Sequence, residues 1–340
     1  MNIDTSLFKD LGIDVKDLMI AVTFHCSRRC IHCSLGNDWL DTDQYFDYDD
    51  LVDLVGTFSR SGLDRLSILG GEPFLYPWIS DFILKIQDFP IKERRIVTSG
   101  WSLGYFDMNV VKPNYLNHIS ISFEGHTSNL HDQIRGIGTF RKAMHTMDKL
   151  RENGFKVFVV YTVTSHNLSS VCDAVAFFNK IGIEEINFHM VSLTGNAAIH
   201  KELLVQPAEW VTLFERLTRL NKINGIRLRI PKLFVTKEQY DLELARGYHN
   251  ILLGSYKSPT AGHKILLYPN GRVYTSCDLT GTDYHLAYYE DKVFLPNPNE
   301  NELTQWHKDM YHPSPAAILR RVDCNGFIPL SVSYKEIIQY

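Results

Sequence analysis

Met19-Ile-Ala-Val-Thr-Phe24 is an apolar, partly β-branched run, and it leads directly into His25-Cys26-Ser-Arg-Arg-Cys30-Ile-His-Cys33. A run of this kind is typical of a strand. Three thiols so close together cannot pair with one another without leaving one over, and six cysteines in 340 residues are not a disulfide framework. We therefore expect a strand that ends in a metal-binding loop, in a protein of a reducing compartment.

Five further strand-like runs follow at intervals of roughly 30 residues: Arg65–Leu69, Arg94–Thr98, His118–Phe123, Lys156–Thr164 and Glu185–Val191. Helical patterns lie between them, at Asp49–Ser61, Pro77–Ile86, Thr139–Asn153 and Ser169–Ile181. Parallel strands need crossover helices, so this alternation predicts a parallel sheet. Six such repeats are too few for an eightfold barrel. The predicted fold is α/β, a partial (β/α)6 TIM-type barrel.

The pattern changes after about residue 200. Pro207–Leu220 predicts one more amphipathic helix, and His263–Asp278 alternates around Asn270-Gly271, a strong hairpin signal. Glu302–Tyr311 predicts a short helix. We expect three parts: the barrel over 1–200, a helical connection over 201–260, and a small C-terminal appendage with a β-hairpin over 261–340.

The cysteine loop follows a strand end, where chemistry collects in barrels of this kind. Three thiolates can hold three irons of a [4Fe–4S] cluster and leave the fourth iron open to a ligand. A structural zinc site would need a fourth protein ligand, which His25 or His32 could supply. The three cysteines alone leave both interpretations open.

The Cys-x3-Cys-x2-Cys run resembles the signature of the radical S-adenosylmethionine (SAM) superfamily. Other segments resemble that family in the expected order over roughly residues 19–200: Gly70-Gly71-Glu72-Pro73, Val97-Thr98-Ser99-Gly100, Ser120–Gly125, His131–Gly136 and Val163–Asn167. Ser99 departs from the family's frequent asparagine, and Glu124 departs from its usual aspartate. The combined match favours a cluster over zinc.

The resemblance implies that one [4Fe–4S] cluster, held by Cys26, Cys30 and Cys33, cleaves SAM to a 5′-deoxyadenosyl radical. That radical abstracts a hydrogen atom from a substrate C–H bond. Burial and hydrogen bonds to sulfur can tune a cluster to the low potential required. A reductant such as flavodoxin or ferredoxin is then a partner.

The resemblance also implies which residues bind SAM. Glu72, with Gly70, Gly71 and Pro73, receives the ammonium group. Arg135 pairs with the carboxylate, because its planar fork suits bidentate recognition. The other cofactor-binding candidates are Ser122 and Glu124 towards the ribose or methionine, His32 against the adenine, and Thr98, Ser99 and Thr164 at strand ends. Arg135 could instead be a solvated charge, His32 a surface ring and Glu124 a cap.

Leu267–Cys277 resembles the opening hairpin of the SPASM/twitch-like extensions that carry further clusters in many relatives. Only Cys277 and Cys324 remain there, and Cys172 lies on a predicted barrel helix, so we expect a reduced extension and one cluster only. A thiol near the barrel mouth can return a hydrogen atom to a substrate radical. Cys277 is the first candidate for this catalytic role and Cys324 the second; either could instead be a small buried hydrophobe.

We expect an epimerase acting on a small polar substrate, such as a sugar, aminoglycoside or amino-acid derivative. About 18 residues precede the first strand, which leaves no room for an added leader-binding domain. The alternatives are a peptide-modifying maturase, by epimerisation or C–C or C–S cross-linking, and a non-catalytic iron–sulfur or zinc protein. Arg227–Lys232 could meet an acidic substrate or be a strand with a solvated face.

Net charge and hydropathy argue against nucleic acid and against a membrane as partners. The formal net charge is −4, so no basic footprint for nucleic acid is present overall. No run of about 18 apolar residues occurs, and no leader-like segment opens the chain, so we expect no membrane span and a cytoplasmic protein.

Overall fold

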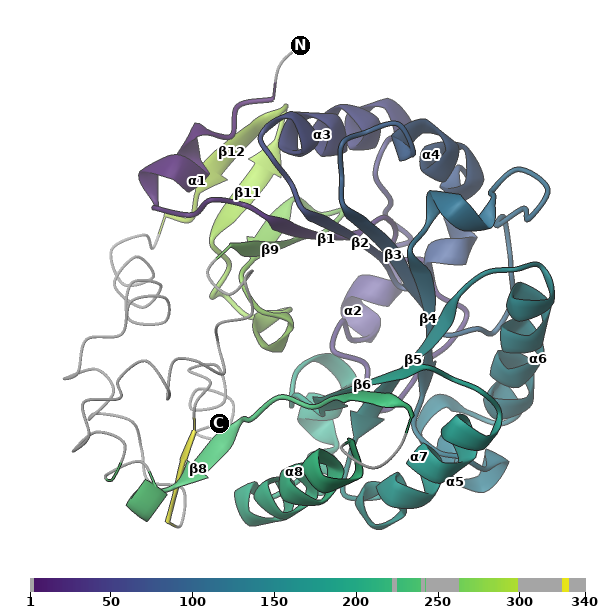
Figure 1. The fold of residues 1–340 in the computed structure, drawn as a ribbon. Helices are drawn as coiled ribbons and strands as arrows, with labels where there is room; N and C mark the ends of the chain where they lie inside the picture. The colour runs from purple at the N-terminus through teal and green to yellow at the C-terminus, as the bar shows by residue number, and fades with distance from the viewer. Residues whose placement is uncertain (1–2, 222–224, 240–241, 243–262, 299–325, 330–340) are drawn as a thin grey trace.

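The computed structural model describes residues 3–221, 225–239, 242, 263–298 and 326–329. One curved sheet runs in the order β12-β11-β10-β9-β1-β2-β3-β4-β5-β6-β7, and β8 pairs with β13 apart from it (Figure 1). The strands are β1 (Asp17–Ala21), β2 (Arg65–Leu69), β3 (Glu93–Thr98), β4 (His118–Phe123), β5 (Val157–Val163), β6 (Glu185–Met190), β7 (Arg227–Arg229), β8 (Phe234–Thr236), β9 (Lys264–Leu267), β10 (Arg272–Tyr274), β11 (Ala287–Glu290), β12 (Val293–Pro296) and β13 (Phe327–Pro329).

Strands β1 to β7 are parallel to their neighbours, and helices cover the outer side of the curved sheet (Figure 1). The sheet does not close on itself, because β7 and β12 are its two edges. The prediction of a partial α/β barrel is confirmed. The stretch Arg227–Lys232 supplies a seventh parallel strand, β7, beyond the six that were predicted.

The helices stand between the strands as expected, with small shifts at their ends. They are α1 (Ser6–Asp10), α2 (Asn37–Leu40), α3 (Tyr48–Arg60), α4 (Ile79–Ile86), α5 (Ser128–Arg135), α6 (Thr139–Glu152), α7 (Val171–Lys180) and α8 (Pro207–Asn221). Short 3-10 turns are η1 (Pro73–Leu75), η2 (Pro113–Tyr115), η3 (Leu168–Ser170), η4 (Gly195–Ile199), η5 (Lys201–Leu203) and η6 (Cys277–Leu279). Pro77 precedes α4 instead of opening it, and the predicted start of α7 is the separate turn η3.

Strand β1 ends at Ala21, whereas the apolar run predicted a strand to Phe24. The chain leaves the parallel sheet there, and the amide of Phe24 donates to the carbonyl of Gln44. Thr23 bridges Tyr45 in the antiparallel sense. The segment before the cysteines is therefore fixed by a local pairing with residues 44–46, which no sequence period could reveal.

The two faces of the barrel strands differ in chemistry. On β2, β3 and β4 the residues Leu66, Ile68, Ile96, Ile119 and Ile121 are buried in the main core under the helices. Successive side chains of a strand point to opposite faces. The alternating residues of the same strands, which include Arg65, Arg95 and His118, therefore face the inside of the barrel.

The predicted hairpin at Asn270-Gly271 is confirmed, with β9 and β10 on either side of it. Gly271 has a φ of 77°, and a Cβ there would lie 2.3 Å from the carbonyl oxygen of Tyr289. Only glycine fits this turn. The hairpin is joined to the barrel, because β9 lies parallel to β1 and extends the same sheet.

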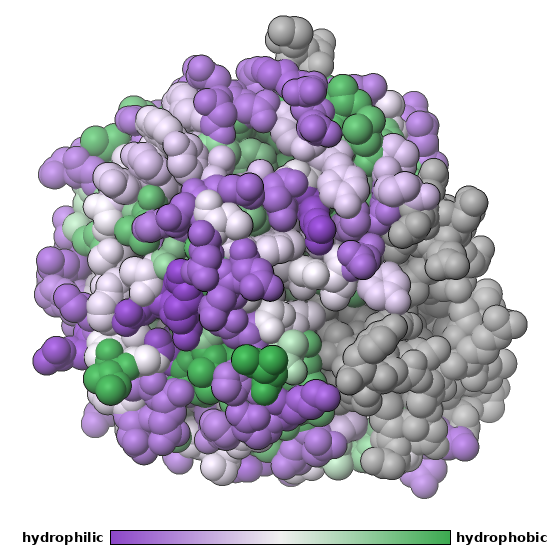
Figure 2. Space-filling view, turned by 180° about the vertical axis from the view of Figure 1, so that it is seen from behind, coloured by the Kyte–Doolittle hydropathy of each residue, from purple (hydrophilic) through white to green (hydrophobic). Residues whose placement is uncertain are grey.

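Cys324 and the helix predicted at Glu302–Tyr311 lie outside the described residues, and the three domain boundaries stay predictions. None of the described helices combines the length and apolarity that a membrane crossing requires. Figure 2 shows the face opposite to that of Figure 1. Hydrophilic residues predominate on its described part, and apolar residues form separate small patches.

Candidate active site

A cavity of about 300 Å³ lies at the carboxyl ends of the parallel strands. Eleven of the predicted site residues line it: Cys26, Cys30, His32, Cys33, Gly70, Gly71, Thr98, Ser99, Ser122, Arg135 and Cys277. Four others, Glu72, Pro73, Glu124 and Thr164, are buried and do not line it. The structure thus gathers predicted residues from six segments of the sequence around one cavity.

The cysteine loop is held by a turn that the sequence analysis missed. The side-chain amide of Asn196 donates to the carbonyl of Cys30 at 3.0 Å, and its backbone amide donates to the carbonyl of Cys33 at 2.9 Å. The preceding Gly195 has a φ of 56°, and a Cβ on it would lie 2.5 Å from the Cys33 carbonyl oxygen. These contacts all end on backbone carbonyls of the cysteine loop, so no residue pattern indicated them.

Cys30 is buried, and Cys26 and Cys33 are partly buried. Burial raises the pKa of the Cys26 thiol to about 12 and that of Cys30 to about 11, and it raises the pKa of Cys33 as well. The backbone amide of Arg28 donates to the Sγ atom of Cys26 at 3.4 Å. The thiols are protonated without a metal, and a bound metal would displace those protons.

Glu72 holds the neighbouring strand end in place. Its buried carboxylate accepts hydrogen bonds from the hydroxyl of Thr98 at 2.7 Å, the amide of Ser99 at 2.9 Å, the Ser99 hydroxyl and the amide of Phe74 at 3.2 Å. Burial raises the pKa of Glu72, and these hydrogen bonds oppose the rise. The carboxylate is thus fully engaged by protein donors, and Gly70 and Gly71 present the backbone of this segment to the cavity.

Gly71 is required by a close approach of two backbones. A Cβ on it would lie 2.3 Å from the carbonyl oxygen of Phe24 and 2.7 Å from that of His25. The amide of Gly71 donates to the carbonyl of Thr23 at 2.7 Å. The end of β2 is therefore packed directly against the segment that leads into Cys26.

Arg135 and Glu124 form a buried ion pair beside the cysteines. The Nε atom of Arg135 donates to one carboxylate oxygen of Glu124, and its Nη2 atom donates to the other at 2.8 Å. His32 Nε2 lies 3.4 Å from the same carboxylate. Although burial alone would raise the pKa of Glu124, the charge of Arg135 and the hydrogen bonds that it donates hold this pKa well below its usual range. Arg135 is therefore largely buried and paired with a protein carboxylate, and it is not a solvated charge.

Several other groups around the cavity were not singled out from the sequence. His131 is buried and accepts the amide of Glu124 on Nδ1, and burial lowers its pKa to about 4. Asn167 donates to the carbonyls of Glu124 and Thr162 and accepts the amide of Thr164. His131 thus ties α5 to the end of β4, and Asn167 ties together the ends of β4 and β5. Both lie in segments that the sequence analysis had already marked.

An aromatic cluster places the C-terminal hairpin at the cavity. Tyr268 packs against Phe24 and Trp39, with ring centroids 6.1 and 5.2 Å away. Its hydroxyl shares a 2.7 Å hydrogen bond with Thr280, just beyond η6. Cys277 packs partly buried against this cluster and lines the cavity together with the three clustered cysteines.

The donor set fits a [4Fe–4S] cluster. Three thiols from one short loop face the cavity, and the N–H of Arg28 is directed at one sulfur. Among the described residues, no group of three or more His, Cys, Asp or Glu side chains is arranged around a single ion. Zinc sites hold four ligands within about 2.3 Å of one centre, which this arrangement does not resemble.

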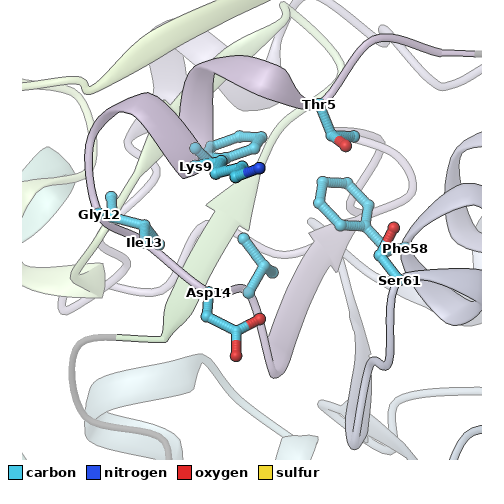
Figure 3. A pocket seen from close by; sticks show the side chains of 9 residues that line it. Thr5, Lys9, Gly12, Ile13, Asp14, Phe58 and Ser61 are labelled. Atoms are coloured by element: carbon cyan, nitrogen blue, oxygen red, sulfur yellow. The ribbon is translucent and has the colours of Figure 1, made fainter.

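A second cavity of about 410 Å³ lies on the outside of the barrel. Figure 3 shows the side chains that line it, from α1 and the turn after it on one side and from Phe58 and Ser61 of the α3 region on the other. It contains no thiol and is remote from the strand ends. It is not part of the candidate active site.

Two curated relatives are similar to part of the chain. A GTP 3′,8-cyclase of Clostridium perfringens is 27% identical over 52% of this chain and 56% of that protein. An AdoMet-dependent heme synthase of Nitratidesulfovibrio vulgaris is 26% identical over 61% of this chain and 57% of that protein. The chain thus spans little more than half the length of these relatives.

Two solved structures share the fold over nearly the whole chain. Streptococcus suis SuiB bound to its precursor peptide SuiA aligns with a TM-score of 0.63 and 16% identity, covering 94% of this chain and 70% of that one. Native anSMEcpe with bound AdoMet and a Cp18Cys peptide aligns with a TM-score of 0.62 and 17% identity, covering 95% and 96%.

A family model described as the Radical SAM superfamily matches residues 20–194. This match spans more than half of the 340 residues and includes the cysteine loop, the Gly70–Pro73 segment and the Glu124–Arg135 pair. Members of the family use a [4Fe–4S] cluster and SAM. The chain belongs to the radical SAM superfamily.

Proposed function

We propose that this chain removes a hydrogen atom from a carbon of a small polar substrate and returns one from Cys277, which inverts that carbon. The observation that supports this most directly is the position of Cys277. It lines the same cavity as Cys26, Cys30 and Cys33, although 244 residues separate it from the last of them. A thiol placed there faces a substrate from the hairpin side of the cavity.

In this proposal the residues around the cavity have separate roles. Cys26, Cys30 and Cys33 hold the cluster, and the backbone at Gly70 and Gly71 accepts the ammonium group of SAM. Arg135 binds the SAM carboxylate through Nη1, which has no acceptor among the described residues. When bound, the reduced cluster and SAM supply a 5′-deoxyadenosyl radical that takes a hydrogen atom from the substrate. Glu124 fixes the orientation of Arg135, so it is a positioning residue.

When the hydrogen atom returns to the substrate, the S–H bond of Cys277 breaks and a C–H bond forms on the substrate carbon. Cys277 is left as a thiyl radical, and one electron and one proton restore it. The electron comes from the same kind of one-electron reductant that reduces the cluster, such as flavodoxin or ferredoxin. SAM is consumed to methionine and 5′-deoxyadenosine.

A second candidate function is modification of a peptide. SuiB and anSMEcpe have this fold, and their structures hold a precursor peptide and a Cp18Cys peptide. The alignment with anSMEcpe covers almost all of both chains. A peptide maturase would use the same cavity, with the reacting residue of the peptide at the strand ends.

The test is an anaerobic assay of reconstituted protein in D₂O with candidate substrates from both classes. We expect 5′-deoxyadenosine to form and one solvent deuterium to enter the inverted carbon. Cys277→Ala should keep 5′-deoxyadenosine formation and lose the inverted product, whereas Cys172→Ala, on α7, should behave as the wild type. Inverted, deuterated product from Cys277→Ala would disprove the assignment of the donor.

A further inference from the structure

Below the cavity, the inner wall of the barrel is charged. Val97 of β3 and Leu69 of β2 line the cavity, and side chains on one face of a strand recur every second residue. Arg95 therefore lies on the cavity face of β3, one step deeper than Val97. In the sheet register it stands between Ser67 of β2 and His118 of β4.

The carboxylates on this wall are already paired with other arginines. Arg65 contacts Asp17 at 3.2 Å and Glu93 at 2.8 Å. Glu185 contacts Arg227 at 3.0 Å and Arg229 at 2.7 Å. Three arginines thus pair with the three carboxylates, whereas Arg95 has no carboxylate within 4.0 Å in the described part of the chain.

The guanidinium of Arg95 has one hydrogen-bond partner among the described residues. Its Nε atom donates to the hydroxyl of Ser67 at 2.8 Å, and no acceptor is found for Nη1 or Nη2. His118 beside it supplies no negative charge, and its ring is neutral because burial lowers the pKa of His118 to about 4. Burial also lowers the pKa of Arg95, although arginine remains charged at neutral pH.

The charges of Asp17 and Glu93 act on Arg95 only from beyond contact distance. A half-buried guanidinium that no carboxylate contacts is unfavourable, and an anion placed against its fork recovers that energy. The Ser67 contact fixes the Nε side of the group and leaves the Nη edge for a ligand. This arrangement is preorganised, because the anion need not displace any protein partner.

We propose that Arg95 binds an anionic oxygen group of the substrate, either a carboxylate or a phosphate. This inference rests on the proposed function, since it assumes that the substrate enters the cavity above Arg95. Arg95 and Val97 are two residue steps apart along the strand, which is about 7 Å. The substrate is then a compound whose acidic group lies about that far from its reacting carbon, with the acid pointing down the barrel.

The experiment measures anion binding to the reconstituted full chain with SAM at saturation, so that the SAM carboxylate site is filled. Phosphate and acetate are titrated separately against chloride at equal ionic strength, and the unfolding midpoint is followed. We expect a saturable rise with at least one of the two anions. The anion that gives the larger rise identifies phosphate or carboxylate as the preferred group.

Arg95→Met should weaken this binding at least tenfold, and Arg95→Lys should weaken it several-fold because the charge remains but the fork is lost. The matched control is Arg219→Met, an exposed arginine on α8, which should bind as the wild type does. If Arg95→Met does not fold, the anion binding measured for Arg95→Lys tests the inference. No saturable rise in the wild type, or equal binding by the Arg95 variants, would overturn the inference.

Formation of 5′-deoxyadenosine is measured on the same protein preparations, anaerobically with a one-electron reductant such as reduced flavodoxin and with the candidate substrates, and it separates the two proposals. Anion binding with no 5′-deoxyadenosine would refute the proposed function and leave the Arg95 site standing. 5′-Deoxyadenosine without anion binding would refute the Arg95 site alone.

Discussion

The Glu124 carboxylate and the Arg135 guanidinium face each other through two parallel hydrogen bonds, with Glu124 completely buried. One end of this pair comes from the end of β4 and the other from the last turn of α5. Because Arg135 also lines the cavity, the ion pair couples the packing of the barrel to the shape of the site.

Glu124→Gln should destabilise the protein by about 3 kcal/mol, because it leaves the Arg135 charge buried without its partner. It should also weaken SAM binding, since Arg135 is then free to turn. Chemical unfolding and SAM titration measure the two effects. Glu215→Gln is the control, because it breaks an exposed pair with Arg219 and should leave both quantities unchanged. Wild-type stability in Glu124→Gln would refute the role given to the pair.

Replacing Cys26, Cys30 or Cys33 by serine should abolish the four-iron centre. Serine keeps the size of the side chain but removes the thiolate that iron requires. Iron and sulfide analysis and the electron paramagnetic resonance spectrum of the reduced protein measure the loss. Cys172→Ser should retain full iron content, because Cys172 lies on α7 away from the cavity. Full iron content in any of the three loop variants would contradict the assignment.

Asn196→Ala should lower cluster content without touching a cysteine. It removes the amide that donates to the Cys30 carbonyl and to Asn37, and it should cost about 1–3 kcal/mol. Iron per chain after reconstitution and the unfolding midpoint are the measurements. Asn129→Ala, at an exposed position on α5, is the matched control and should change neither. An Asn196 variant with wild-type iron content would show that the loop holds its shape unaided.

His118 should make stability fall in mild acid. Burial lowers its pKa from 6.5 to about 4, so between these values the unfolded chain binds a proton that the folded chain does not. This contribution is fully present above pH 6.5 and is lost as the pH falls, by about 2 kcal/mol between pH 6.5 and 5. Unfolding free energies over that range should fall less steeply in His118→Gln. The slope that remains comes in part from His131, whose pKa burial also lowers to about 4. An unchanged slope in His118→Gln would contradict this account.

The barrel could be predicted because its signals are local. Apolar runs such as His118–Phe123 and helices such as Thr139–Glu152 each carry their own period, and parallel neighbours follow from the crossovers. The pairing of β9 with β1 could not be predicted. It joins Lys264 to Asp17, and a register between such distant residues depends on tertiary packing.

The sequence indicated which residues gather at the candidate site better than it indicated what each of them contacts. Glu72 and Glu124 were expected to face the cofactor, but their carboxylates are turned towards Ser99 and Arg135. Residue type and order indicate which side chains gather, whereas the partner of each one depends on the path of the backbone. Asn196 was missed for the same reason, because it binds main-chain carbonyls.

The pairing of β9 with β1 also bears on how the chain matures as it leaves the ribosome. One edge of β1, directly before the cysteine loop, has no strand beside it until Leu267 has been synthesised. Until then the loop lacks the aromatic hairpin that packs beside it in the finished fold. Cys277 follows later still, so the site is complete only after the parallel strands β1 to β7 have been synthesised.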